Sequence, residues 1–293
     1  MSDERRTRDD SAPDGRRLFA QQGLRAKRSF GQCFLADANI ARRLAHECVP
    51  DPSVTVLEIG AGTGALTRPL LDLGAQVVAI ERDREMIPIL REAFRGAIDS
   101  GQLTIHEADA AACDWASLLG ESPAPRVVAG NVPYQITGRL LERATAMAAE
   151  VQRVVFMIQK KVADRIEARC GTREYGALSV FVRRSFHVVK RLAVPPSCFR
   201  PQPSVHSAVL VMEPNQPIVG PVSEVLRTLV LTSFSRRRKT LRNAWRGAFG
   251  LDGPAWEQLA RDAGIGLDAR PETLSPQDYE RVAASVRALR NGR

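Results

Sequence analysis

The sequence predicts an α/β protein in which an open, Rossmann-like sheet precedes a small helical region. Short apolar runs typical of buried strands alternate with amphipathic helical patterns up to residue 213. A glycine loop and three polar residues follow four successive predicted strands. Beyond the turn at 213–217 the strand signals stop, and the rest of the chain has a helical pattern. These three observations give the fold class and place the candidate site at the carboxyl ends of the strands.

The length of 293 residues and the 44% hydrophobic content suffice for one large domain and one small one. We expect a disordered tail over 1–15, a main domain over 16–213 with a basic arm at 16–37, and a helical domain over 214–293. No apolar stretch approaches the ~20 residues of a membrane span, and the amino terminus is charged. The prediction is therefore a cytoplasmic protein. Five scattered cysteines and four histidines form no CxxC or HxxxH pattern, so neither a metal site nor a disulfide is expected.

The net charge of +9 is unevenly distributed along the chain. It is +3 over 1–49, −6 over 50–130, +7 over 131–213 and +5 over 214–293. A polyanion that touches everything except a cofactor pocket in the acidic quarter would explain this pattern. Ordinary solubilising charge is the alternative. In the arm, Arg25, Lys27 and Arg28 are interleaved with aromatic residues, which suits RNA, although an arm packed on the domain fits nearly as well.

The strand expected at 54–59 runs into a loop with glycines at 60, 62 and 64, where the backbone can approach a ligand closely. This loop alone also fits a dinucleotide site. Glu81 ends the next strand and could accept hydrogen bonds from ribose hydroxyls, which S-adenosylmethionine and NAD share. Asp109 follows the third strand and could accept from an adenine amino group. Each acid could instead cap a helix.

The fourth strand ends in Asn131-Val132-Pro133-Tyr134, whose residue types suit methyl transfer to an exocyclic amine of a nucleobase. The Asn131 side-chain oxygen and the Pro133 carbonyl could accept the two N–H bonds and localise the nitrogen lone pair. Tyr134 offers a flat face to a base removed from its stack. The alternative is a plain turn with a core tyrosine. A methyl donor is favoured over NAD, whose chemistry does not use this turn.

Two further segments complete the candidate site. The proline-rich loop 194–205 is expected to hold Phe199 rigidly opposite Tyr134, with a core position as the alternative. Basic strands around Arg183, Arg184, Lys190 and Arg191 are expected near the substrate entrance. The basic run at 235–243 is expected within a helix and to contact phosphates through Arg236, Arg237, Arg238, Lys239 and Arg242.

From Leu24 to about Leu289 the chain resembles the ribosomal RNA adenine N6-dimethyltransferase family. The shared motifs are Phe30-Gly31-Gln32-x-Phe34-Leu35, Val56-Leu57-Glu58-Ile59-Gly60-x-Gly62-x-Gly64, Asn131-x-Pro133-Tyr134, Gln159-Lys160, Val194-Pro195-Pro196-x-x-Phe199-x-Pro201, and Arg237-Arg238-Lys239-Thr240-Leu241-Arg242-Asn243. The last motif favours the small-subunit enzymes over the large-subunit (23S) enzymes of erythromycin resistance. A non-catalytic RNA-binding assembly factor on the same fold is a further alternative.

The resemblance implies a seven-stranded class I S-adenosylmethionine-dependent methyltransferase domain over 16–213 and an RNA-binding helical domain over 214–293. It implies dimethylation of two adjacent adenines in the 3′-terminal hairpin of small-subunit (16S) ribosomal RNA, by a monomer acting on an assembling subunit. Carried over by position, the donor contacts are Cys33, Leu35, Gly60, Gly62, Glu81, Asp109 and Asn131. The base contacts are Asn131, Pro133, Tyr134 and Phe199.

Three positions depart from the family pattern. The family has asparagine at position 33, so Cys33 weakens or removes a hydrogen bond to the donor. The usual Leu-Pro-Tyr-Asn-Ile-Ser is Val132-Pro133-Tyr134-Gln135-Ile136-Thr137, which is a mild change. Lys161 replaces a common glutamate and adds positive charge.

Overall fold

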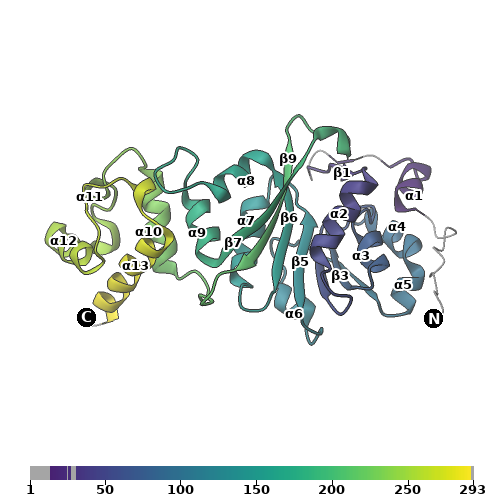
Figure 1. Ribbon diagram of the computed structural model, residues 1–293, viewed down its shortest axis with the longest axis horizontal. Helices are drawn as coiled ribbons and strands as arrows, with labels where there is room; N and C mark the ends of the chain where they lie inside the picture. The colour runs from purple at the N-terminus through teal and green to yellow at the C-terminus, as the bar shows by residue number, and fades with distance from the viewer. Residues whose placement is uncertain (1–13, 25, 28–30, 292–293) are drawn as a thin grey trace.

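The computed structural model describes residues 14–24, 26–27 and 31–291 (Figure 1). Its centre is a seven-stranded sheet with the order β4-β3-β2-β5-β6-β9-β7. The first five strands of this order are parallel, and β9 is antiparallel to both of its neighbours. The strands are β2 (Thr55–Ile59), β3 (Gln76–Glu81), β4 (Leu103–Glu107), β5 (Arg126–Asn131), β6 (Arg153–Gln159), β7 (Phe186–Val194) and β9 (Ser207–Pro214). The strand order reverses between β2 and β5, which is where open α/β sheets bind ligands.

Side chains that alternate along the strands form two apolar cores, one on each face of the sheet. Val56 of β2 belongs to one core, and its neighbour Leu57 belongs to the other. Helices α2 (Ala38–Cys48), α3 (Thr67–Asp72) and α4 (Met86–Ala93) cover the first face, and α5 (Arg95–Asp99) follows α4. The second face is covered by α6 (Trp115–Leu119), α7 (Thr137–Ala146), α8 (Lys160–Glu167) and α9 (Ala177–Ser185). The central strands are therefore buried on both sides, as the continuous apolar runs predicted.

The amino-terminal arm is packed against the main domain. Helix α1 (Gly15–Gln21) buries Leu18 in the first core, and the Phe19 ring meets the Phe34 ring edge-on at 5.2 Å. Strand β1 (Phe34–Leu35) pairs with β8 (Phe199–Arg200) in a separate two-stranded sheet. The described part of the arm thus follows the alternative in which it packs on the domain. A disordered tail was predicted over residues 1–15. Of these, residues 1–13 lie outside the described part of the chain.

Beyond β9 the chain is helical, with α10 (Glu224–Ser235), α11 (Leu241–Ala244), α12 (Gly253–Asp262) and α13 (Pro276–Asn291) (Figure 1). These helices share a third apolar core, which also contains Tyr175 and Val180 from the preceding domain. The Tyr175 hydroxyl donates to the Leu274 carbonyl at 2.9 Å, and Arg184 pairs with Glu280. The helical region is therefore joined to the main domain through buried contacts.

Two local predictions were wrong. Arg183 and Arg184 lie in α9 and not in a strand, since β7 begins only at Phe186. The basic run is not helical, because α10 ends at Ser235 and α11 begins at Leu241. Arg236 to Thr240 form the connection, and Arg236 bends back so that its guanidinium donates to the Ala244 carbonyl at 3.2 Å.

Candidate active site

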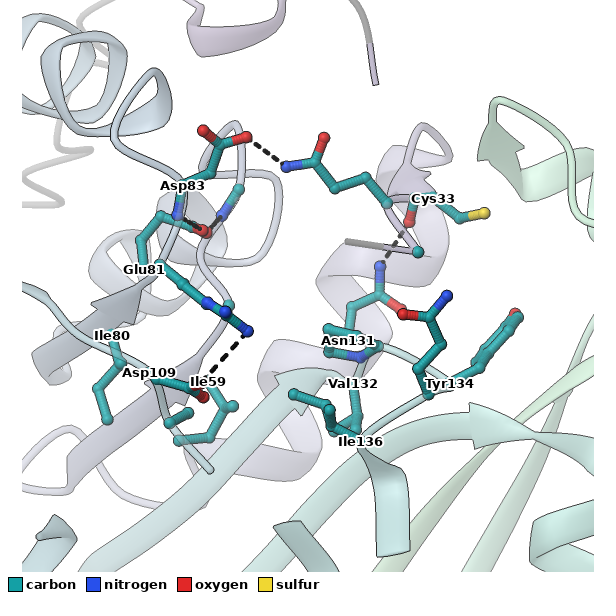
Figure 2. Close-up of a pocket in the computed structure, with 18 of the residues that line it drawn as sticks. Cys33, Ile59, Ile80, Glu81, Asp83, Asp109, Asn131, Val132, Tyr134 and Ile136 are labelled. Carbon is teal, nitrogen blue, oxygen red and sulfur yellow. Dashed lines mark hydrogen bonds and ion pairs between the residues drawn. The ribbon is translucent and has the colours of Figure 1, made fainter. Parts of the chain in front are cut away.

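A cavity lies at the carboxyl ends of β2, β3, β4 and β5, where the sequence placed the candidate site (Figure 2). Its volume is about 950 Å³, counting the part that is open to solvent. The residues that line it are Gly31, Gln32, Cys33, Phe34, Ile59, Gly60, Gly62, Ile80, Glu81, Arg82, Asp83, Ala108, Asp109, Ala110, Asn131, Val132, Pro133, Tyr134, Gln135 and Ile136. Apolar side chains form most of the floor of the cavity, and polar groups line its walls. One wall is the amino-terminal arm, which the strand-end argument did not anticipate.

The glycine loop after β2 has the conformation that the sequence requires of it. Gly60 and Gly62 have φ values of +72° and +56°, which are costly for residues with a side chain. A Cβ atom on Gly62 would also lie 3.1 Å from the Phe34 ring. The loop therefore brings its main chain directly to the cavity.

Glu81 is a buried acid that lines the cavity, with 7% of its surface exposed. Its carboxylate accepts hydrogen bonds from the main-chain nitrogens of Gly62 and Asp83, at 2.7 and 2.8 Å. Burial raises the pKa of Glu81, against the effect of these hydrogen bonds. The acid is thus fixed between the ends of β2 and β3, where it can meet a ligand that lies across them.

Asp109 lines the same cavity beyond β4 and is more exposed than Glu81. One of its oxygens accepts from the Ala111 nitrogen at 2.9 Å, and the other lies 3.2 Å from the Arg82 guanidinium. These contacts hold the carboxylate at the cavity wall, and Figure 2 shows the ion pair that Asp109 makes.

Asn131 stands at the end of β5 and its side-chain amide has a defined orientation. Its Nδ2 donates to the main-chain carbonyl of Cys33 at 2.9 Å, so its Oδ1 is the remaining acceptor (Figure 2). Because the contact uses the carbonyl of position 33, it does not depend on which side chain stands there. Burial raises the pKa of the Cys33 thiol, which makes it a weak nucleophile.

The Pro133 carbonyl is not a free acceptor in this structure. It accepts from the Ile136 nitrogen at 3.2 Å and from the Thr137 hydroxyl at 3.1 Å, which uses both lone pairs. By contrast, no described residue donates to the carbonyl of Val132, the preceding residue on the cavity wall. The expected role of the Pro133 oxygen is therefore corrected, because this oxygen closes the turn that begins α7.

The two aromatic residues differ in their surroundings. Tyr134 lines the cavity, and its hydroxyl is 2.7 Å from that of Ser207. Burial raises the pKa of Tyr134, so its hydroxyl is neutral. Phe199 is fully buried in the first core and pairs with Leu35 across β1 and β8. Neither Phe199 nor Leu35 lines the cavity described above. In this conformation Phe199 occupies a core position, which was the alternative to a place opposite Tyr134.

The predicted RNA contacts fall into different environments. Arg25 and Arg28 lie outside the described residues. Lys27 pairs with Asp83 and Glu85 at 2.7 and 3.0 Å, beside the cavity. Arg237 donates to the main-chain carbonyls of Thr172 and Arg173, and Arg242 pairs with Glu257 at 2.8 Å and with Asp268 at 3.4 Å.

Arg238 and Lys239 are exposed on the α10–α11 connection, and their side chains have no hydrogen-bond or ion-pair partner among the described residues. With Arg246, which the sequence argument missed, they line a shallow basic hollow on the surface.

Within the described part of the chain, no three His, Cys, Asp or Glu side chains gather as a metal-binding group. None of its helices combines the length and apolar character that crossing a membrane requires.

Comparison with known proteins agrees with this geometry. The family model for ribosomal RNA adenine dimethylase matches residues 23–286. The ribosomal RNA small subunit methyltransferase A of Anaeromyxobacter sp. (strain K) is 39% identical over 92% of this chain and 96% of its own length. The protein of that name from Aromatoleum aromaticum is 39% identical over 91% of this chain and 98% of its own length.

The same fold is found in a crystal structure of a dimethyladenosine transferase from Plasmodium falciparum. That structure has a TM-score of 0.70 at 24% identity and covers 85% of this chain and 95% of its own. The predicted class I methyltransferase fold is confirmed by this likeness and by the strand order. The chain belongs to the ribosomal RNA adenine dimethylase family.

Proposed function

We propose that the protein uses S-adenosylmethionine to dimethylate N6 of two adjacent adenines in the 3′-terminal hairpin of small-subunit (16S) ribosomal RNA. The observation that carries the proposal is one cavity that joins Gly60, Glu81, Asp109 and Asn131 in a member of this family. The substrate is taken from the small-subunit relatives, which match over nearly their whole length. The proposal includes action by a cytoplasmic monomer on an assembling subunit.

The donor side of the proposal rests on the strand ends. When bound, S-adenosylmethionine supplies an electrophilic methyl group on a sulfonium. Gly60 and Gly62 would let the main chain approach its methionyl part, Glu81 would accept hydrogen bonds from its ribose hydroxyls, and Asp109 would accept one from the amino group of its adenine. The apolar side chains of Ile59 and Ile80 on the cavity floor suit a flat purine.

The acceptor side rests on Asn131 and the residue after it. The Asn131 Oδ1 accepts one N–H of the target amine, and the open Val132 carbonyl takes the second in place of the occupied Pro133 carbonyl. Two acceptors direct the nitrogen lone pair toward the methyl group. The new N–C bond would form as the carbon–sulfur bond of the donor breaks to leave a neutral thioether, and the methylated amine would then release its proton to water. Tyr134 stacks on the base, and closure by Phe199 on the other side requires its ring to leave the core. Catalysis is then positioning and desolvation, without a covalent intermediate.

The RNA side rests on the surface of the helical domain. Arg238 and Lys239 are open to phosphates, whereas Arg236, Arg237 and Arg242 are held by carbonyls or acids. We infer that the first two contact the RNA backbone and that the other three shape the connection. An exposed cation without a protein partner contributes most to the free energy of RNA binding, because its contact with a phosphate releases counterions from the RNA.

The proposal is tested by offering labelled donor with under-methylated small subunits, large subunits and naked RNA in parallel. Mass spectrometry then locates the dimethyladenosine. Label in the 3′-terminal hairpin of the small-subunit RNA is the expected result. Label in large-subunit RNA would instead support an enzyme of the erythromycin-resistance type. Failure to bind donor would indicate a non-catalytic assembly factor.

A further inference from the structure

Asp83 is a buried acid at the edge of the cavity, and the mechanism above gives it no role. Its side chain is only 2% exposed, and it accepts hydrogen bonds from two side chains of the arm, one an ammonium and the other an amide. Its carboxylate accepts from Lys27 Nζ at 2.7 Å, from Gln32 Nε2 at 2.7 Å and from the Glu85 nitrogen at 3.1 Å. Burial alone would raise the pKa of Asp83, but these hydrogen bonds lower it. Asp83 is therefore a charged anchor built into the fold.

Gln32 extends this anchor into the arm. While its Nε2 donates to Asp83, its Oε1 accepts from the Lys27 nitrogen at 2.7 Å. The Gln32 nitrogen also donates to the Lys27 carbonyl at 3.3 Å. Both ends of the Gln32 amide are thus used, one on the β3 side and one on the arm. The position of the chain at residue 33 follows from these bonds.

The next residue connects the anchor to the acceptor side. The Cys33 carbonyl accepts from Asn131 Nδ2 at 2.9 Å, which decides where the Asn131 Oδ1 points. On the other side of the anchor, the Asp83 nitrogen donates to Glu81 at 2.8 Å. An unbroken series of contacts therefore runs from the donor residue Glu81, through Asp83, Gln32 and Cys33, to Asn131 (Figure 2).

We propose that Asp83 is a positioning residue that clamps Lys27, Gln32 and Cys33 of the arm at the cavity wall and thereby aims the Asn131 amide at the target amine. This inference rests on the proposed function, because it assigns Asp83 a part in the same reaction. Loosening the clamp moves one cavity wall and frees the Asn131 amide to rotate. The donor KM should therefore rise, and kcat should fall even with saturating donor.

The test exchanges the hydrogen-bond donor and acceptor between positions 83 and 32. In Asp83→Asn one amide N–H faces the Gln32 Nε2 donor, and in Gln32→Glu two carboxylates face each other. The double variant restores a donor opposite an acceptor, and the new carboxylate can still accept from the Lys27 nitrogen. Glu107→Gln is the matched control, since it also neutralises a paired carboxylate on this side of the sheet, where Glu107 meets exposed Arg84 at 2.6 Å.

We expect each single variant to lower kcat about tenfold and the double variant to recover to within about threefold of the unaltered protein, as contacting pairs couple. Thermal unfolding without donor should be similar for Gln32→Glu and the control. The clamp is disproved if the single effects simply multiply in the double variant, or if both single variants keep full kcat. Absence of methylation by the unaltered protein would instead refute the proposed function. In that event the clamp is tested by the donor affinities of the unaltered protein, the two single variants and the double variant, measured by calorimetry. Weaker binding by each single variant and recovery in the double variant would support the clamp.

Discussion

Replacing Glu58 with glutamine should make the protein more stable at alkaline pH. Glu58 lies on β2 beneath the glycine loop, is 1% exposed and accepts from the Thr67 hydroxyl at 2.7 Å. Burial is the main cause that raises the pKa of Glu58 from a reference of 4.5 to about 7; hydrogen bonds from Thr67 oppose this shift, and the nearby Glu81 charge supports it. The glutamine oxygen can accept the same hydrogen bond without a charge.

The sign follows from proton binding in the two states. Between these pKa values the folded protein holds a proton that the unfolded chain has released, so the free energy of unfolding falls as pH rises. From near pH 5 to near pH 8 the loss is about 2.5 kcal/mol, taking 1.36 kcal/mol for each pKa unit. Glu58→Gln removes this component. The stability of the variant relative to that of the unaltered protein should therefore be about 2.5 kcal/mol greater near pH 8 than near pH 5.

Urea unfolding at the two pH values measures this difference, followed by far-UV circular dichroism. Glu121→Gln, at an exposed acid after α6, serves as the matched control and should leave the pH dependence unchanged. A stability difference between Glu58→Gln and the unaltered protein that stays constant with pH would refute the reasoning. It would mean that Glu58 remains charged in the core throughout this range.

Three further changes address the site and the RNA surface. Tyr134→Phe should keep most of the turnover, while Tyr134→Ala should reduce kcat/KM for RNA by roughly tenfold to a hundredfold through lost stacking, as steady-state kinetics would show. Replacing Arg238 and Lys239 together by alanine should weaken subunit binding and reduce its log–log salt slope by about two, with unchanged donor affinity by calorimetry. Gly62→Ala should weaken donor binding about tenfold or more, measured by calorimetry, because its φ is +56° and the new Cβ meets the Phe34 ring.

The strand ends of the site could be predicted from the sequence because they depend on local patterns. Each buried run is followed directly by its polar residue, and parallel strands place their carboxyl ends together. Glu81, Asp109 and Asn131 therefore meet as expected. The same reasoning could not find Asp83 and Gln32 as a pair, because 51 positions separate them and neither belongs to a periodic pattern.

The secondary-structure predictions were wrong where one local sequence pattern suits two kinds of secondary structure. The residues of α9 include two valines and a phenylalanine, which suit a strand as well as a helix, and its burial against α7 and α8 decides for the helix. At the basic run, Leu241 and Trp245 have the i, i+4 spacing of a helix, which favours a helix that continues through the arginines. Tertiary contacts of Arg236 and Arg237 instead end α10 before it.

Asn131→Ala most directly tests the central claim that this side chain acts on the acceptor amine and not on the donor. Donor affinity is measured by calorimetry, and single-turnover methylation of under-methylated small subunits is measured with saturating donor. We expect a donor affinity within about threefold of that of the unaltered protein, because at most one net hydrogen bond to the donor is lost. Dimethylation should fall to background. Full dimethylation by Asn131→Ala would show that this side chain does not act on the acceptor amine.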